Sequence, residues 1–306
     1  MTFPSPQRPT FDHRPRGRIF DHAEFDPETL LRAKGSTSIT VAIPAKDEAA
    51  TVGPIVATIK RHLIDRLPLI DELLVMDDLS TDATAALAAD AGAKVISTAE
   101  VLPGYGAGGK GEALWKSLHA SSGDVIIWCD ADIRNFDTRF IVGCLGPLLL
   151  NEDIGFIKGF YRRPLNEDGE GGGRVTELVA RPLITNLFPR LEDMIQPLSG
   201  EFGGRRRLLE QVPFSRGYAV DLALLIDLSK RFGPDIIAQV DLGSRVHRNR
   251  PLRQLGPQAA AITAMALQRA GFDQPAGMLT MKRPEFGDAS ITIGDLPPLA
   301  TLAGER

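Results

Sequence analysis

The chain has 306 residues, of which 43% are hydrophobic, 24% charged and 6% aromatic, and its formal net charge is −4. These values exclude collagen-like, intrinsically disordered and disulfide-rich classes, and the charge does not favour nucleic-acid binding. No segment approaches the ~20 apolar residues of a membrane span, and two cysteines are too few for a disulfide framework. We therefore expect a protein of a reducing, cytoplasmic compartment, with neither nucleic acid nor a membrane as partner.

The first 18 residues contain four prolines and several arginines, but no apolar run of the kind found in secretory signals. This composition predicts a flexible arm, which together with a short lead-in occupies residues 1–37.

Strands and helices alternate from residue 38 to residue 135. The spacing of apolar residues predicts strands at 38–44, 71–76, 94–97 and 124–129, with helices at 51–63, 81–91 and 111–121. Strands that are apolar along most of their length are typical of a parallel sheet covered on both faces. The fold class predicted from this half is therefore α/β, with crossover helices between parallel strands.

The pattern is less regular after residue 135. It predicts strands at 156–161 and 236–241, helices at 175–187, 218–232 and 257–270, and a flexible glycine-rich loop at 167–173. Pro182 falls inside the first of these helices and predicts a kink there. Residues 277–306 contain three prolines and little periodicity, and we expect an irregular C-terminal tail.

Acidic side chains follow three of the predicted strands, in residues 46–48, 77–78 and 130–132. Ligands of parallel α/β sheets bind beyond the carboxyl ends of the strands, so these side chains are expected to meet. The pair Asp130 and Asp132 is an Asp-x-Asp arrangement, which suits Mg²⁺ or Mn²⁺ together with a bound sugar nucleotide. His247, set among arginines after a late strand, is either a further metal ligand or an ordinary surface histidine.

Two glycine-rich segments precede predicted helices and carry a cation. Residues 106–111 include Lys110, and residues 171–176 include Arg174 and Thr176. Bare backbone amides and a cation near a helix start favour an anion, a phosphate in the first case and a small phosphorylated or carboxylated acid in the second. A flexible loop and a glycine hinge are the respective alternatives. The sequence has no Gly-x-Ser-x-Gly elbow of serine hydrolases, no Cys-x-x-Cys pair of zinc sites, and no Gly-x-Gly-x-x-Gly fingerprint of dinucleotide-binding folds after the first strand.

Taken together, these segments resemble the glucosyl-3-phosphoglycerate synthases of actinobacteria and their close relatives that transfer mannose. The resemblance covers most of the chain and rests on six segments in one order, at 43–48, 109–115, 130–132, 160–165, 171–182 and 247–252. It implies a GT-A fold with a C-terminal acceptor-binding subdomain, and a retaining hexosyltransferase that acts as a homodimer with a divalent cation. Residues 38–135 would then bind the nucleotide sugar, and residues 136–276 would bind the acceptor and complete the metal site.

The resemblance also implies roles for single residues. The donor, a nucleotide-diphosphate sugar, would contact Pro44, Ala45, Lys46, Glu48, Asp78, Lys110, Asp130, Ala131, Asp132, Tyr218 and Asp221. The acceptor, 3-phosphoglycerate, would contact Gly173, Arg174, Thr176, Asn249 and Arg250. The metal would be held by Asp132 and His247. Catalysis would involve the backbone carbonyl of Leu198 at the anomeric centre, with Asp132 and Arg250.

Three positions depart from the pattern of the glucosyl enzymes, which usually have Leu at the position of Lys46, Ser-Gly at 78–79 and Glu at the position of Asp221. These departures leave UDP-glucose as the expected donor and GDP-mannose, or both guanosine sugars, as the alternative. A polyprenyl-phosphate glycosyltransferase and a nucleotidyltransferase are further alternatives among enzymes, and a non-catalytic nucleotide-sugar sensor is an alternative from another class.

Overall fold

The computed structural model describes residues 18–162, 173–246, 251–274 and 276–302. Residues 1–17 of the predicted arm lie outside the described residues. The segment 247–250, which contains His247, Asn249 and Arg250, also lies outside them. None of the described helices combines the length and the apolar composition that spanning a bilayer requires.

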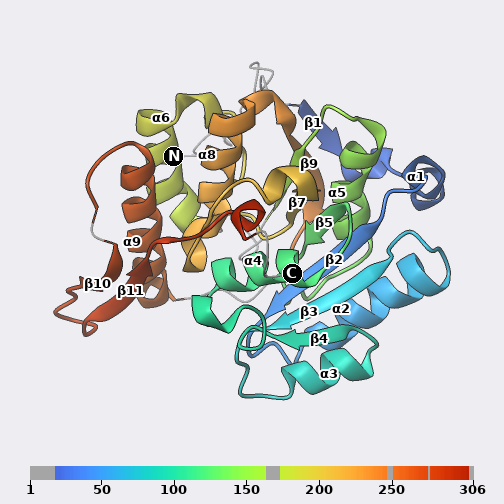
Figure 1. Ribbon diagram of the computed structural model, residues 1–306, viewed down its shortest axis with the longest axis horizontal. Coiled ribbons are helices and arrows are strands. Elements are labelled where there is room, and N and C mark those ends of the chain that lie inside the picture. Colours follow the sequence, from blue (N-terminus) through green and yellow to red (C-terminus); the bar gives the residue numbers. More distant parts are fainter. Residues whose placement is uncertain (1–17, 163–172, 247–250, 275, 303–306) are drawn as a thin grey trace, which may run out of the picture.

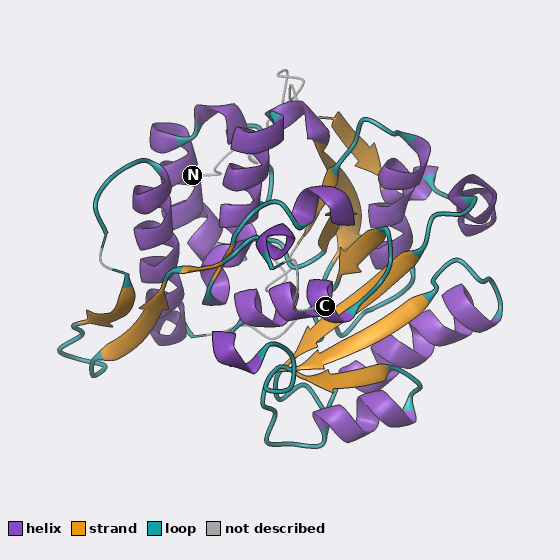
Figure 2. Ribbon diagram, viewed as in Figure 1, coloured by secondary structure: helices purple, strands orange, loops and turns teal. Residues whose placement is uncertain are grey.

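The described strands form one mainly parallel eight-stranded sheet (Figure 2). Its order is β1 (Arg18–Asp21), β9 (Ile237–Ser244), β6 (Phe156–Arg162), β7 (Phe202–Arg205), β5 (Val125–Trp128), β2 (Ile39–Ala45), β3 (Glu72–Asp77) and β4 (Lys94–Ser97). Within this described sheet only β7 runs antiparallel to its neighbours. The parallel α/β sheet predicted from the alternation is confirmed, and it continues through both predicted halves without a break at residue 135.

Helices cover both faces of the sheet (Figure 1). On one face pack α1 (Pro27–Lys34), α2 (Val52–Ile59), α3 (Thr84–Asp90) and α5 (Arg139–Leu150). On the other pack α4 (Lys110–Ala120), α7 (Arg206–Leu209) and α8 (Val220–Phe232). The same apolar cluster includes α6 (Arg181–Leu187) and α9 (Leu252–Arg269), and α9 packs against α8 and α6. Side chains of each strand alternate between the two layers: Val41 and Ile43 face the first, Ala42 the second.

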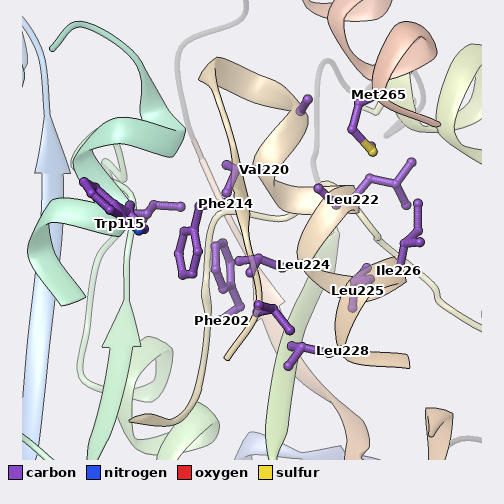
Figure 3. Close-up of a cluster of buried hydrophobic side chains, with 14 of the residues drawn as sticks. Trp115, Phe202, Phe214, Val220, Leu222, Leu224, Leu225, Ile226, Leu228 and Met265 are labelled. Atoms are coloured by element: carbon purple, nitrogen blue, oxygen red, sulfur yellow. The ribbon is translucent and has the colours of Figure 1, made fainter. Parts of the chain in front are cut away.

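The second layer contains the aromatic core that supports the ends of β5, β7 and α4. Figure 3 shows Trp115 of α4, Phe202 of β7 and Phe214 gathered against the apolar side of α8. The ring centroids of Trp128 and Phe202 lie 5.4 Å apart. All four rings are fully buried, so they fix the position of the first turn of α8 relative to the sheet.

Prolines change two of the predicted helices locally. The helix predicted over 175–187 is one helical run, which is π-helical over Thr176–Ala180 and α-helical from Arg181. The change of helix type lies directly before Pro182, the residue without an N–H. Helix α9 begins before Pro257 and runs through it. The carbonyl of Arg253, which faces Pro257 without a backbone donor, instead accepts a hydrogen bond from Arg283 at 2.7 Å.

The described residues near both ends of the chain contain strands that the sequence analysis did not predict. Arg18, assigned to the arm, begins strand β1, which pairs with β9. The prediction of an irregular tail at 277–306 is wrong, because its described part contains the hairpin β10 (Gly277–Met281) and β11 (Ala289–Ile293), and β12 (Asp295–Leu296) pairs with β8 (Phe214–Ser215). Leu296 and Leu299 are buried, so the tail returns to the core after the hairpin.

The tail is held to α4 through Trp115, whose indole donates a 2.8 Å hydrogen bond to the carbonyl of Pro297. We predict that Trp115→Phe lowers the free energy of unfolding by about 2 kcal/mol, because a buried carbonyl loses its partner. It should also speed proteolysis within residues 282–302. Denaturant unfolding and limited proteolysis with mass spectrometry measure the two effects.

Trp128→Phe is the matched control, because the Trp128 indole donates at 2.8 Å to Ser117 inside the core and not to the tail. Trp128→Phe should lower the free energy of unfolding by a similar amount without faster cleavage of the tail. Equal cleavage in both variants would contradict the assigned role of Trp115.

Candidate functional site

A cavity of about 320 Å³ lies at the carboxyl ends of β2, β3 and β5, beside the first turn of α4. Ten of the eleven predicted donor residues line it: Pro44, Ala45, Lys46, Glu48, Asp78, Lys110, Asp130, Ala131, Asp132 and Tyr218. The acidic strand ends therefore meet at one edge of the sheet, as the pattern predicted, and the glycine-rich loop before α4 joins them. Their individual roles stay predictions.

The glycine-rich loop is held in place by Asp78. The buried carboxylate accepts hydrogen bonds from the backbone N–H groups of Gly108 at 3.1 Å and Gly109 at 2.9 Å, and from the Thr98 hydroxyl at 3.1 Å. Burial raises the pKa of Asp78 above its ordinary value, although these bonds and Lys46 oppose the shift. Gly108 has φ +91°, which favours glycine. Asp78 thus positions the loop that leads into Lys110.

Lys110 projects from the start of α4 into a set of carboxylates. Its Nζ lies 3.2 Å from both oxygens of Asp221 and 3.3 Å from Asp130 Oδ1. Burial alone lowers the pKa of Lys110, but the two carboxylates outweigh it and raise that pKa well above its usual range. Asp221 itself is 2% exposed and does not line the cavity. The structure therefore places this predicted donor residue behind Lys110, one layer below the cavity wall.

Arg245, which follows β9 directly, is a site residue that the sequence analysis missed. It is 3% exposed, donates to Asp130 Oδ2 at 3.0 Å, and contacts Asp132. On its other side it pairs with Glu201 Oε1 at 3.2 Å and donates to the Tyr161 hydroxyl at 2.5 Å. Its position two residues before His247, at the end of a strand, was the available signal.

Burial and charge act in opposite directions on the carboxylates around Arg245. Burial raises the pKa of Asp130, but the charges of Lys110 and Arg245 lower it by more. The pKa of Asp130 therefore lies well below the ordinary range. For Glu201, which is fully buried, burial exceeds the attraction of Arg245 and raises the pKa. Asp130 is therefore ionised at neutral pH and fixed between two cations.

The residues present fit a divalent cation. Asp132 presents a carboxylate at the cavity wall, and the two aspartates already draw a cation, Arg245, between them. Oxygen donors of this kind suit Mg²⁺ or Mn²⁺. Among the described residues no group of three or more His, Cys, Asp or Glu side chains forms a complete metal site, and the predicted second ligand, His247, lies outside them.

The loop of residues 196–200, which contains Leu198, is pressed against Asp130. A Cβ on Gly200 would lie 1.8 Å from Asp130 Oδ2, so only glycine allows this approach. Gln196 ties the loop to β6, because its side chain donates to the Tyr161 carbonyl at 2.5 Å and accepts from the Tyr161 N–H at 3.3 Å. The predicted catalytic carbonyl of Leu198 thus lies two residues from a contact with the donor cavity.

The three predicted acceptor residues that the structure describes, Gly173, Arg174 and Thr176, do not line the cavity at the ends of β2, β3 and β5. Gly173, with φ +81°, precedes the π-helical turn that contains Thr176. Arg174 borders a separate, mainly apolar cavity of about 520 Å³ between this turn, α9 and the β10–β11 hairpin. The other two members, Asn249 and Arg250, lie outside the described residues.

We predict that Gly200→Ala weakens binding of a nucleotide-sugar donor about tenfold or more, because the added methyl displaces the Asp130 carboxylate. Titration calorimetry measures the change. Gly53→Ala is the control, since a Cβ there would meet only ordinary contacts of 3.6 Å and more. Unchanged donor affinity in Gly200→Ala would mean that Asp130 is not part of the donor site.

Comparison with known proteins shows which family the chain resembles. Residues 40–211 match the family described as glycosyl transferase family 2. Glucosyl-3-phosphoglycerate synthase of Petrotoga mobilis is 45% identical over 260 residues, which is 82% of this chain and 80% of that protein. The enzyme of the same name from Mycolicibacterium smegmatis is 46% identical over 283 residues, 89% of this chain and 92% of its own.

The fold also matches that of solved structures. The crystal structure of glucosyl-3-phosphoglycerate synthase from Mycobacterium tuberculosis with Mn²⁺, UDP-glucose and phosphoglyceric acid has a TM-score of 0.86 and 41% identity, and covers 94% of this chain and 100% of that chain. A structure of the same enzyme with Mn²⁺, UDP and glucosyl-3-phosphoglycerate has a TM-score of 0.82 and 41% identity, over 95% and 98% of the two chains. The predicted family, fold class and hexosyltransferase class are thereby confirmed: the chain belongs to glycosyl transferase family 2 and, within it, to the glucosyl-3-phosphoglycerate synthases.

Proposed function

We propose that this chain transfers glucose from UDP-glucose to the 2-hydroxyl of 3-phospho-D-glycerate, with retention of the anomeric configuration and with Mg²⁺ or Mn²⁺ bound. The observation that carries the proposal is the donor cavity, whose wall contains ten of the eleven residues expected to bind a nucleotide sugar. Relatives named for this reaction, and the UDP-glucose and phosphoglyceric acid in the similar crystal structure, support the choice of substrates.

Each part of the donor would contact a different part of the cavity wall. Pro44, Ala45 and Glu48, at the end of β2, would bind the nucleotide. Lys110, whose side chain is 12% exposed, would donate to the diphosphate from the start of α4. Asp132 would hold the metal together with His247, and the bound metal would neutralise charge on the departing diphosphate.

The proposed transfer needs no separate carboxylate base. The bond between the anomeric carbon and the diphosphate oxygen breaks, and the acceptor hydroxyl oxygen forms the new bond on the same face. The hydroxyl proton passes to the departing diphosphate oxygen. The Leu198 carbonyl would face the positive charge that develops on the sugar, a placement supported by the contact between Gly200 and Asp130.

The acceptor would be recognised through its two anionic groups. Arg174 offers a planar guanidinium, and Gly173 and Thr176 offer a backbone amide and a hydroxyl at the same turn. We propose that Asn249 and Arg250 complete this site. Because Arg174 and the donor cavity lie on different elements, the two substrates would approach each other from separate walls.

The proposal is tested by initial rates with UDP-glucose, GDP-glucose and GDP-mannose against 3-phosphoglycerate, each with Mg²⁺, Mn²⁺ or EDTA. We expect UDP-glucose to be used at least about tenfold better than the others and EDTA to abolish turnover. Faster turnover with GDP-mannose would show that GDP-mannose, and not UDP-glucose, is the donor. No product in any combination, beside measurable donor binding, would instead favour a nucleotide-sugar sensor.

The acceptor assignment is tested by Arg174→Ala. Loss of a charge-assisted contact to an anionic acceptor should raise the KM for 3-phosphoglycerate about 100-fold and the KM for UDP-glucose less than about twofold. Steady-state kinetics with each substrate varied in turn measures the split. Arg190→Ala, at an exposed position, is the control and should change neither value. A larger effect on the donor KM would show that Arg174 serves the donor instead.

A further inference from the structure

A second lysine lies beneath the donor cavity, on the central part of β6. Lys158 is 1% exposed, and its Nζ lies 3.9 Å from the centroid of the Phe202 ring, one of the core rings of Figure 3. Among the residues that the structure describes, this Nζ has no hydrogen-bond acceptor. Its ion-pair partner within them is Asp221, whose Oδ1 lies 3.5 Å away.

Stability does not explain why a charge is buried here. Burial lowers the pKa of Lys158 to about 8, and the attraction of Asp221 offsets only part of that effect, while Lys110 adds to it. The folded protein therefore disfavours the charged form of Lys158 relative to the unfolded chain. A buried cation that does not stabilise the fold is a candidate for a functional role.

The groups that face Lys158 come from four elements. They are Asp221 on α8, Lys110 on α4, Asp130 after β5 and the Phe202 ring on β7. Of these, Asp221 is shared: Lys110 binds both of its oxygens at 3.2 Å, and Lys158 approaches Oδ1 from the core. Asp221 is itself 2% exposed, so water cannot replace either cation.

Donor binding would change this arrangement. Lys110 lines the cavity and would turn toward the diphosphate, whereas Asp221 does not reach the wall. Without a second cation, the departure of Lys110 would leave a buried carboxylate unpaired, which is strongly unfavourable. The Lys158 ammonium has no hydrogen-bond acceptor among the described residues, and it already lies within ion-pair distance of Asp221.

We propose that Lys158 is a positioning residue that serves as the second counter-ion of Asp221 and thereby allows Lys110 to leave Asp221 for the donor diphosphate. This inference rests on the proposed function for the identity of the ligand that Lys110 binds. It assigns to β6 a part in donor binding although no atom of Lys158 reaches the cavity wall.

The test is a double-mutant cycle of UDP affinity in the presence of Mn²⁺, measured by titration calorimetry on wild type, Lys158→Met, Asp221→Asn and the double variant. UDP lacks the sugar, so predicted contacts of Asp221 with sugar hydroxyls do not enter. We expect Lys158→Met to weaken UDP about tenfold, because Lys110 is then the sole counter-ion of Asp221. Asp221→Asn should bind UDP at least as well as wild type, and the double variant within about threefold of Asp221→Asn.

Recovery in the double variant is a result that a purely structural role of Lys158 would not produce. Unchanged UDP affinity in Lys158→Met, or a double variant as weak as Lys158→Met, would overturn the proposal. Lys34→Met is the matched control, since Lys34 is also a buried lysine paired with one aspartate, Asp71, at 2.7 Å and outside the cavity wall. It should leave UDP affinity unchanged.

A pH titration keeps the proposal testable where Lys158→Met fails to fold. The affinity of the wild type for UDP should fall as pH rises through about 8, beyond any change seen in Asp221→Asn under the same conditions. Parallel profiles in the two proteins would overturn the proposal. Turnover by the wild type separates the role of Lys158 from the proposed function. If the double-mutant cycle gives the expected affinities but no product forms, the proposed function is refuted. If turnover is normal but the cycle does not give those affinities, only the role of Lys158 is refuted.

Discussion

The arrangement of the site depends on how the carboxylate of Asp130 is neutralised. It lies 3.3 Å from Lys110, at the start of α4, and 3.0 Å from Arg245, which follows β9. Lys110 also contacts Asp221, and Arg245 also contacts Asp132 and Glu201. Together with Lys158, which pairs with Asp221, three cations therefore alternate with four carboxylates beneath the cavity. This alternation makes their burial tolerable and leaves one carboxylate in excess when all are ionised. That excess favours a divalent cation at the wall.

Close backbone approach makes the charge arrangement possible. Gly203 of β7 has no room for a Cβ, which would lie 2.3 Å from the Ile126 carbonyl of β5. This antiparallel strand joins the parallel half that carries Asp130 to the half that carries Arg245. Gly200, in the preceding loop, faces Asp130 in the same way. The glycines thus bring the cations of one half within reach of the carboxylates of the other.

The sequence was sufficient for the parallel strands other than β1, because buried β-branched runs are local signals. The charged residues that follow these strands indicated part of the cavity wall in the same way, whereas Pro44, Ala45 and Tyr218 were expected only from the family resemblance. It was insufficient for β7, whose sequence Phe-Gly-Gly-Arg has no strand pattern, and for β10–β11, where exposed strands alternate weakly. Arg245 and Lys158 were missed for another reason. Each acts through residues more than 40 positions away along the chain, and only the sheet order brings them together.

The departures at Lys46 and Asp78 are better understood together than singly. Burial raises the pKa of Asp78 and the charge of Lys46 opposes that rise, so the two side chains interact at the cavity wall. Compared with the Leu and Ser usual in the glucosyl enzymes, the pair adds one cation and one anion and leaves the net charge of the nucleotide site unchanged. Asp78 also bonds the loop before Lys110 through its two oxygens. The substitution therefore alters chiefly how that loop is anchored, which is compatible with an unchanged uridine donor.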